Sequence, residues 1–443
     1  MIRGVRGAPD ILPPDSTALW QRLEGAARSL FAAYDYAEIR TPVFERTELF
    51  VRGIGEGTDI VEKEMYTFQD KGGESLTLRP EGTAPAVRAW LEHGQFVKGA
   101  LTKVYYIGPM FRHERPQAGR FRQFHQIGAE AIGSASPEVD AEVIEMLGHL
   151  FCALGLRDVT LHLNTIGDAA CRPAMRERFV AYVRDRKDEL CADCHVRLEK
   201  NPLRIMDCKR EGCQAAVAGA PKAAESLCDP CRAHFARVRE LLDAMGMPYV
   251  LNERLVRGLD YYTRTTFEFT AAGLGAQNAI AGGGRYDGLI ETIGGPPTPA
   301  IGFAVGMERV ILCLKAAAPP AEGRRDGVYV ANADAVSATR AFLVARDVRR
   351  ADAGVRAVSN LEGRSLKAQL RQADQGLFRY CVILGERELQ SGAAAVKDLG
   401  QGSQETVPLA DLAAWLAPRA GGHGRGEARV RAEGGAGTGG AGE

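Results

Sequence analysis

The 443-residue sequence lacks several features that would place it in a common functional class. It carries no net charge, with 56 basic and 56 acidic residues, which excludes nucleic-acid binding through a basic tail but not through a local basic groove. No segment approaches the roughly 18 consecutive apolar residues of a membrane span. There is no GxGxxG at a strand–helix junction and no GK[ST] loop, which excludes a Rossmann fingerprint and a Walker loop. Repeats at solenoid or propeller periods are also absent.

The cellular compartment is predicted from the absence of a secretory signal. The first residues, MIRGVRGAPDILPPDS, contain arginines but no apolar h-region, so we expect no secretory signal. Ten cysteines without such a signal favour reduced thiols or metal ligands over disulfides. We therefore expect a cytoplasmic protein.

The apolar patterns predict an α+β protein. Strand-like runs separated by turns favour a largely antiparallel sheet in the first part of the chain. These runs are Tyr36–Thr41, Leu76–Leu78, Lys103–Gly108, Phe124–Ile132, Val159–Asn164, Tyr249–Asn252, Asp260–Thr270 and Asn278–Gly284, with helices at about Thr17–Tyr34, Pro137–Leu154 and Gly306–Lys315. Later, strand-like and helical patterns alternate in the βαβ rhythm of a parallel sheet. The strands there are Val328–Ala331, Val355–Ser359 and Tyr380–Leu384, and the helices are Ala333–Ala353 and Ser365–Gln375.

The segment RPEGTAPAVRAW brings a carboxylate, an unsubstituted backbone and a hydroxyl into one turn. Glu81, Gly82 and Thr83 follow the end of a predicted strand. Together such groups can bind an ammonium group. A capped helix start is the simpler interpretation of the same residues, and both stay open.

The segment YYIGPMFRHERPQAGRFRQFHQIGAEAIG predicts two antiparallel strands joined by an arginine-rich loop. Guanidinium groups bind phosphates through paired hydrogen bonds. A polyanion lying across a sheet therefore suits this segment better than a solvated charged hairpin does. Gln126 and Glu130 lie four residues apart, hence on one face of the return strand, where both could contact a polar substrate.

Two later segments carry further candidates. LVRGLDYYTRTTFEF predicts a turn with Arg257 and then a strand in which Tyr261 and Tyr262 point to opposite faces; an ordinary strand with core tyrosines is the alternative. The glycines of AIAGGGRYDGLIETIGGPPTPAIGFAVGMERVIL admit the close approach of a flat or phosphate-bearing ligand. Arg309 is expected in the first turn of a helix, where a bound phosphate or carboxylate would offset its unfavourable charge.

Together these segments resemble the signature motifs of class II aminoacyl-tRNA synthetases, specifically those of the bacterial histidyl-tRNA synthetase family. RTPVFERTELFVRGIGEGTDIVEKEMYTF is similar to motif 1, FRHERPQAGRFRQFHQIGAE to motif 2 and GFAVGMERV to motif 3. LVRGLDYY and AGGGRYDGL are similar to two short segments peculiar to the histidine enzymes. The resemblance covers about residues 1–418, and the motifs occur in the expected order.

The resemblance implies a class II antiparallel-sheet catalytic domain with a helical insertion, followed by an α/β anticodon-binding domain. We expect the catalytic core in residues 1–169 and 248–318, a cysteine-rich insertion in 170–247, a linker in 319–326 and the anticodon-binding domain in 327–418. Residues 419–443 contain ten glycines and one branched aliphatic residue, and we expect them to be disordered. The resemblance also implies a homodimer with Pro42 at its interface.

The implied activity joins L-histidine to ATP, giving histidyl-adenylate and pyrophosphate, and then transfers histidine to the 3′ end of histidine tRNA, with Mg²⁺ on the phosphates. Arg112 and Arg257 are the implied catalytic residues, on two sides of the α-phosphate. ATP is expected on Arg112, Arg120 and Arg309. Histidine is expected on Glu81, Gly82, Thr83, Arg112, Gln126, Glu130, Arg257, Tyr261 and Tyr262.

Contacts with tRNA are expected at two places. The loop of motif 2, with Arg115 and Gln117, is implied to face the acceptor end. In GRSLKAQLRQADQ, Arg364, Lys367 and Arg371 follow one another at three- and four-residue spacing, which predicts one basic helix face. A solvated face is the ordinary alternative for such a pattern.

The insertion carries two CxxC pairs, Cys191 with Cys194 and Cys228 with Cys231. Two such pairs predict one structural tetrahedral Zn²⁺ site formed by these four cysteines. Cys208, which lies between the pairs, could replace one ligand, and reduced surface cysteines in a helical insertion are the alternative. Cys152, Cys171, Cys313 and Cys381 lie in apolar segments and are expected in the core.

Two other functions compete with the ligase. The regulatory subunit of ATP phosphoribosyltransferase is a non-catalytic relative of the same fold that binds histidine; such proteins typically lack the anticodon domain and parts of the motifs that are complete here. A generic nucleotide-binding or scaffold protein would leave the four segments unexplained. The sequence therefore favours the ligase.

Overall fold

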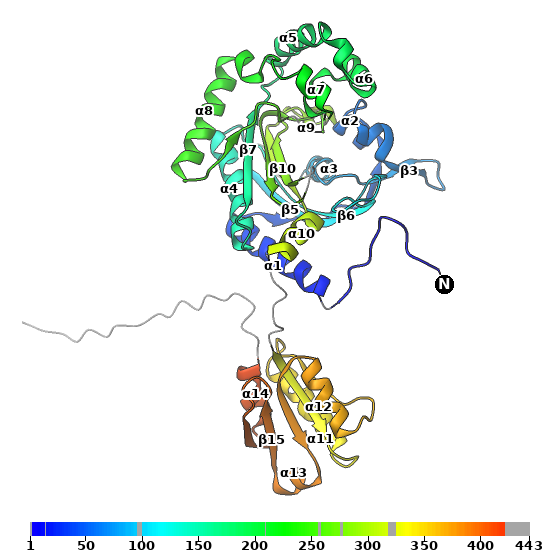
Figure 1. The fold of residues 1–443 in the computed structure, drawn as a ribbon, viewed down its shortest axis with the longest axis vertical. Coiled ribbons are helices and arrows are strands. Elements are labelled where there is room, and N and C mark those ends of the chain that lie inside the picture. Colours follow the sequence, from blue (N-terminus) through cyan, green and yellow to red (C-terminus); the bar gives the residue numbers. More distant parts are fainter. Residues whose placement is uncertain are drawn as a thin grey trace, which may run out of the picture. The chain divides into compact units, whose positions relative to one another are not determined.

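The computed structural model describes residues 2–13, 15–94, 100–208, 210–255, 258–274, 278–317 and 325–420. The chain divides into two units, Met1–Pro319 and Pro320–Glu443, and Figure 1 shows the elements of each. Within the described ranges, no helix has the length and apolar character needed to cross a bilayer.

An eight-stranded sheet forms the centre of the larger unit, in the order β1-β5-β6-β11-β10-β9-β7-β8. Only the two edge pairs, β1–β5 and β7–β8, are parallel, so the expected antiparallel character is confirmed. The strands are β1 (Ala37–Glu38), β5 (Thr102–Phe111), β6 (Gln123–Ile132), β7 (Val159–Thr165), β8 (Val250–Leu251), β9 (Thr263–Ala271), β10 (Ala279–Arg285) and β11 (Ala300–Gly306). The expected strands at Tyr36–Thr41 and Asp260–Thr270 are shorter, because only parts of them pair with neighbours.

Among the described residues, one face of this sheet is covered by α1 (Asp15–Ala33), α4 (Pro137–Ala153) and α10 (Met307–Ala317), and α8 (Asp229–Ala244) adds Val238 and Leu242 to the same core. The apolar stripe of α1 buries Leu23 and Phe31 in the main core. Tyr105 of β5 belongs to that core, whereas Tyr106 belongs to a different cluster that includes Ala86 of α3 (Thr83–His93). Since neighbouring strand residues point to opposite faces, α3 lies on the other side of the sheet.

That other side also carries α2 (Thr47–Ile54), α9 (Leu289–Thr292) and the π-helical turn η1 (Ile60–Glu64). A small antiparallel sheet, in the order β2-β4-β3, adjoins them. Its strands are β2 (Phe44–Arg46), β3 (Tyr66–Gln69) and β4 (Ser75–Leu78). Of these, only β4 was expected from the sequence.

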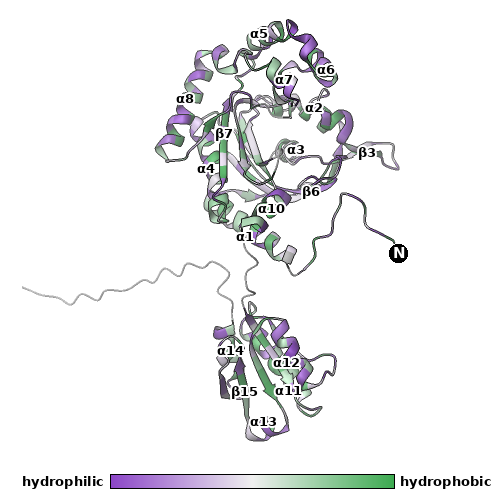
Figure 2. Ribbon diagram, in the orientation of Figure 1, coloured by the Kyte–Doolittle hydropathy of each residue, from purple (hydrophilic) through white to green (hydrophobic). Residues whose placement is uncertain are grey.

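The insertion leaves the sheet after β7 and returns at β8. Its helices are α5 (Arg172–Arg184), α6 (Ala192–Lys200), α7 (Glu211–Ala216) and α8 (Asp229–Ala244), with 3₁₀ turns η2 (Lys187–Glu189), η3 (Pro202–Asp207) and η4 (Ala223–Ser226). Figure 2 shows much of α5, α6 and α8 as hydrophilic, whereas the strands of the sheet are largely hydrophobic. The small core of the insertion includes three cysteines, Cys194, Cys208 and Cys213.

The smaller unit is an α/β domain with a mixed sheet in the order β13-β12-β14-β15-β16. The predicted strands β12 (Asp326–Asn332), β13 (Ala357–Ser359) and β14 (Phe378–Leu384) pair in parallel. Two strands that the patterns did not reveal, β15 (Ala393–Asp398) and β16 (Gln404–Pro408), continue the sheet antiparallel. Its helices are α11 (Ala338–Ala351), α12 (Leu366–Gln375), α13 (Glu386–Ser391) and α14 (Leu412–Ala420).

Two predicted boundaries differ from the structure. Asp326, expected in the linker, begins β12, and Arg419, expected in the tail, lies in α14. The final turn of α14 is kept because Ala417 and Ala420 are buried. Residues 318–324 and 421–443 lie outside the described residues.

Candidate active site

A buried carboxylate, Glu130 of β6, is the centre of the first part of the site. Its side chain is fully shielded from solvent. Tyr286 donates to Oε2 at 2.6 Å, and Thr83 and Tyr106 donate to Oε1 at 2.8 and 3.2 Å. These donors come from α3, β5 and the turn after β10, so four separate parts of the chain meet at this carboxylate. Tyr106 and Tyr286 were not predicted as site residues, although both stand inside the quoted motifs.

The surroundings of Glu130 favour its neutral form. Burial raises the pKa of Glu130 to about 8, against the lowering effect of the Tyr286 and Thr83 hydrogen bonds. Burial likewise raises the pKa of Glu81, which lies close enough to Glu130 to raise that residue's pKa further. A ligand that brings N–H donors or positive charge into this pocket would favour the ionised carboxylate. Strongly shifted carboxylates of this kind are common at functional sites.

Glycines make room for this arrangement. A Cβ on Gly128 would lie 2.2 Å from Cζ of Tyr106, and one on Gly82 would lie 2.2 Å from its Cε2. On β11, a Cβ on Gly302 would lie 1.8 Å from Oε2 of Glu130. The glycines therefore let the Tyr106 ring and the Glu130 carboxylate occupy their positions.

The turn with Glu81, Gly82 and Thr83 forms the start of α3. Glu81 is buried, and its two carboxylate oxygens accept hydrogen bonds from the backbone N–H groups of Thr83 and Ala84, at 2.6 and 2.9 Å. This is the capped helix start that was the simpler interpretation. The structure also brings Thr83 to Glu130, so the turn both caps the helix and faces the pocket, while ammonium binding stays a prediction.

The two adjacent tyrosines do not behave as strand residues. Tyr261 and Tyr262 precede β9 and are both buried, with ring centroids 4.8 Å apart. The expectation that they point to opposite faces of a strand is therefore wrong, because the strand begins only at Thr263. Tyr261 also lies 5.7 Å from Tyr286, centroid to centroid, which places the pair beside the Glu130 pocket.

Gln126 lies on β6, four residues before Glu130. Its side chain is 9% exposed, and its Oε1 accepts no hydrogen bond within the described residues. A buried, unpaired amide oxygen is costly. Gln126 lies four residues from Glu130 on the same strand face, and its contact with a ligand stays a prediction.

The second part of the site is a group of arginines at the loop that joins β5 to β6. Nε of Arg112 donates to the Pro80 carbonyl at 2.9 Å, and its guanidinium lies over the Phe124 ring. Glu114 lies between Arg112 and Arg120, at 3.9 and 3.2 Å from their nitrogens. The structure thus brings two predicted arginines together around one carboxylate.

Arg309 joins the same group from α10. It donates to the carbonyls of Gly119 and Ala279, at 3.2 and 2.5 Å. Burial lowers the pKa of Arg309, and repulsion from Arg120 and Arg112 lowers it further. Three guanidinium groups within electrostatic range of one another form a site that favours a polyanion.

The candidates for tRNA contact and the second catalytic arginine lie outside these two groups. Arg115 and Gln117 are exposed in the loop between β5 and β6. Residues 256–257 lie outside the described residues, so Arg257 is not placed; Asn164 donates to the carbonyl of Leu255, just before it, at 3.0 Å.

The basic surface of the smaller unit differs in one detail. Arg364, Lys367 and Arg371 are all exposed. Arg364, however, precedes α12 and forms an ion pair with Glu362 at 2.5 Å. The prediction of one helix face therefore holds for Lys367 and Arg371 alone.

The predicted metal site is wrong in its grouping. The structure does not gather Cys191, Cys194, Cys228 and Cys231 into one cluster. Within the described residues, the first pair lies with Cys208 and Cys213, and the second pair lies with Cys171 and Asp168. The linear spacing of the CxxC pairs could not reveal this, because the partners come from other segments of the folded insertion. Cys152, expected in the core, is exposed, whereas Cys313 and Cys381 are buried.

Comparison with known protein families identifies the family of the chain. Residues 7–310 match the family model described as histidyl-tRNA synthetase. The chain belongs to the histidyl-tRNA synthetase family. Residues 331–419 match an anticodon binding domain, so the fold predicted from the motifs is confirmed.

Individual relatives agree over nearly the whole chain. A histidine–tRNA ligase of Anaeromyxobacter dehalogenans is 52% identical over 413 residues, covering 93% of this chain and 99% of the relative. One of Moorella thermoacetica is 53% identical over 407 residues, covering 91% and 95%. A crystal structure of apo histidyl-tRNA synthetase from S. aureus, 35% identical, superposes with a TM-score of 0.79 and covers 94% of this chain and 100% of that one.

Proposed function

We infer that this chain is a histidine–tRNA ligase, which activates L-histidine with ATP to histidyl-adenylate and pyrophosphate and then transfers histidine to histidine tRNA. Family membership and the near-complete overlap with such ligases support this function. The structural observation that carries it is the arrangement along β6, with a buried carboxylate pocket at Glu130 and an arginine group where the strand begins.

The Glu130 pocket suits histidine because it offers acceptors for N–H groups. Glu130 has an elevated pKa when no ligand is bound, and Gln126 has an unpaired oxygen on the same strand face. A substrate with an ammonium group and an imidazole supplies donors to such acceptors. Tyr261 and Tyr262 close the pocket beside Tyr286. We assign Glu81, Gly82 and Thr83 to the side of the pocket nearest the substrate amino group.

The arginine group suits the adenylation step. In that step a carboxylate attacks the α-phosphate in line, so two anions must be held together, and charge neutralisation and positioning dominate the barrier. Arg112 adjoins both the turn at Pro80 and the loop with Arg120, and we propose that it holds the substrate carboxylate and the α-phosphate. We propose Arg257 for the opposite side of that phosphate.

The β- and γ-phosphates are assigned to Arg120 and Arg309. Mg²⁺ is held in such sites by phosphate oxygens, waters and one or two carboxylates. Glu114 and Glu268 both lie within electrostatic range of Arg309, so the oxygen donors present fit this ion. When bound, Mg²⁺ would neutralise charge on the leaving pyrophosphate.

For tRNA, we propose that Arg115 and Gln117 contact the acceptor end and that the exposed basic residues of the smaller unit contact the anticodon arm. We further propose a homodimer through the segment at Pro42. Arg79 fixes that segment by donating to the carbonyls of Thr41 and Pro42, and the adjoining Val43 and Phe44 are exposed in the single chain. The cytoplasmic location stays a prediction.

The function is tested by histidine-dependent exchange between ATP and pyrophosphate, followed by charging of histidine tRNA. We expect both activities. Histidine binding without exchange would instead indicate a regulatory, non-catalytic relative and would overturn the proposal.

Arg309→Gln tests the phosphate assignment in the same assay. Removing this charge should lower exchange by at least about 100-fold, the size of effect seen when one stabilising donor is removed from a transition state. Lys315→Ala, at the exposed end of the same helix, is the matched control and should leave exchange within about twofold. An equal effect of the two variants would contradict the role of Arg309.

A further inference from the structure

The insertion holds two separate clusters of metal-ligating side chains outside the active site. The first consists of Cys191, Cys194, Cys208 and Cys213; the second consists of Asp168, Cys171, Cys228 and Cys231. In each cluster the ligand atoms all lie within 4.8 Å of one another. We propose that the insertion binds two structural Zn²⁺ ions, one in each cluster. This inference does not depend on the proposed function.

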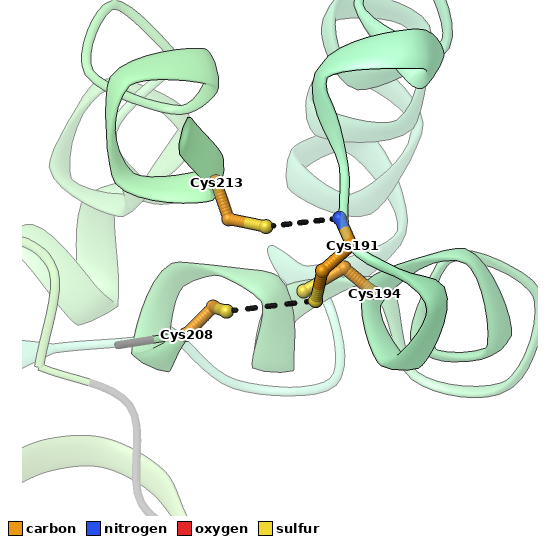
Figure 3. A group of neighbouring side chains, drawn as sticks. All are labelled: Cys191, Cys194, Cys208 and Cys213. Carbon is orange, nitrogen blue, oxygen red and sulfur yellow. Dashed lines mark hydrogen bonds between the residues drawn. The ribbon is translucent and has the colours of Figure 1, made fainter. Parts of the chain in front are cut away.

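The first cluster has the composition and size of a mononuclear Cys₄ site. Figure 3 shows the four side chains converging from α6, the end of η3 and α7. Sγ of Cys191 lies 4.0 Å from Sγ of Cys208. Two sulfurs of a tetrahedral zinc site are about 3.8 Å apart when the Zn–S distance is about 2.3 Å. A disulfide would need about 2.05 Å, so this pair of sulfurs has the spacing of a metal site and not of a disulfide.

The second cluster has the same local design. Cys191 is the N-cap of α6 and Cys228 is the N-cap of α8. The backbone N–H of Cys191 donates to Sγ of Cys213 at 3.2 Å, and that of Cys228 donates to Sγ of Cys171 at 3.1 Å. In both clusters, therefore, a CxxC pair begins a helix and points an N–H at a third sulfur. Such donors and the positive end of a helix stabilise the thiolates that zinc requires.

In the second cluster a carboxylate takes the fourth position. Oδ1 of Asp168 lies 4.0 Å from Sγ of Cys228, while Oδ2 accepts from Nη2 of Arg264 at 3.1 Å. Oδ1 also accepts from the backbone N–H groups of Ala170 and Cys171, at 3.0 and 3.3 Å. Hydrogen bonds at both oxygens therefore hold the carboxylate beside the sulfurs, as is usual for a ligating carboxylate. Arg264 has a left-handed conformation, with φ of 48°, at the point where the pairing of β9 with β10 shifts register.

The positions of the clusters explain what the ions would do. The first ties α6, η3 and α7 together where the small core of the insertion contains Cys194, Cys208 and Cys213. The second joins the segment that leaves β7, at Asp168 and Cys171, to the start of α8. It therefore closes the base of the insertion. Thiolate-rich sites select zinc over hard cations such as Mg²⁺.

The test is the zinc content of full-length protein purified without chelator, measured by plasma mass spectrometry. We expect two zinc ions per chain. Cys194→Ser and Cys231→Ser should each lose one ion, and the double variant should lose both. Cys152→Ser, which removes an exposed thiol outside both clusters, should retain two.

Two measurements on the unmodified chain keep the proposal testable if a variant fails to fold. Replacement of zinc by Co²⁺ should give the visible absorption of tetrahedral Co²⁺ bound to thiolates, and all ten cysteines should titrate as free thiols after denaturation in chelator. A chain without zinc, or with disulfides within the clusters, would overturn both sites. One zinc per chain that is lost in Cys194→Ser but kept in Cys231→Ser would overturn the second site.

Discussion

At the residue scale, the candidate site depends on a few side chains whose neighbours leave them little freedom. Glu130 accepts three hydrogen bonds from hydroxyl groups, and its side chain is fully buried. The sequence predicted that Glu130 and Gln126 lie on the same face of β6, because they are four residues apart in a strand. The donors around Glu130 were not predicted, because they come from distant segments that only the folded chain brings together.

The raised pKa of Glu130 gives a stability prediction with a definite sign. The folded chain binds this proton up to about pH 8, whereas the unfolded chain releases it near pH 4.3. Between these values the folded state holds more protons, so the free energy of unfolding falls as pH rises. Relative to Glu130→Gln, the wild type should lose about 2 kcal/mol between pH 5.5 and 7.5. Thermal melting of both proteins checks this, and parallel pH curves would contradict it.

Gly128 offers a second test at this scale. Gly128→Ala would place a Cβ 2.2 Å from the Tyr106 ring, so we expect overpacking to lower the free energy of unfolding by about 1–3 kcal/mol. Displacement of Tyr106 should also raise the KM for histidine. Gly25→Ala is the control: a Cβ there meets nothing within 4 Å, and in α1 it should be neutral or stabilising by up to about 1 kcal/mol. Similar losses in both variants would refute the packing argument.

At the element scale, a buried ionic network joins the sheet to the insertion. Arg285 of β10 lies 2.7 Å from Oδ1 of Asp140 on α4, and His234 of α8 lies 2.8 Å from Oδ2. Arg285 and Asp140 are fully buried. The glycines before Arg285 were interpreted as room for a ligand. In the structure, the guanidinium group of Arg285 donates to the Ser134 and Ser136 carbonyls as well as pairing with Asp140, so it connects parts of the fold.

Asp140→Ala should therefore destabilise the larger unit strongly. It leaves the buried Arg285 charge with Asp287, at 3.0 Å, in place of two acidic partners. Breaking a buried ion pair from one side typically costs about 3–5 kcal/mol. Chemical denaturation followed by fluorescence would measure the loss. Glu48→Ala, which breaks an exposed pair with Arg52 on α2, should change stability by no more than about 1 kcal/mol. Equal effects would show that the buried network does not stabilise this unit.

At the scale of the whole molecule, the smaller unit is expected to read tRNA through charge. Lys367 and Arg371 lie exposed on α12, which packs in a different hydrophobic cluster from α11. Replacing both by alanine should lower tRNA affinity and reduce the slope of log affinity against log salt by about 0.7–0.9 for each phosphate that is no longer bound. Arg350→Ala on α11 is the control and should leave the slope unchanged. An unaltered slope in the double variant would favour a solvated face.

The family, the fold class and the order of the two matched domains could be predicted from the chain alone, because motif spacing and strand periodicity are local properties. The roles of the candidate site residues stay predictions. The sequence also predicted metal ligands in the insertion. The tertiary structure decided which residues meet: Cys208 and Cys213 with the first CxxC pair, Asp168 and Cys171 with the second, and Tyr286 with Glu130. These contacts join segments far apart in sequence, and only the packing of the folded core fixes which of several equally plausible partners comes within bonding distance.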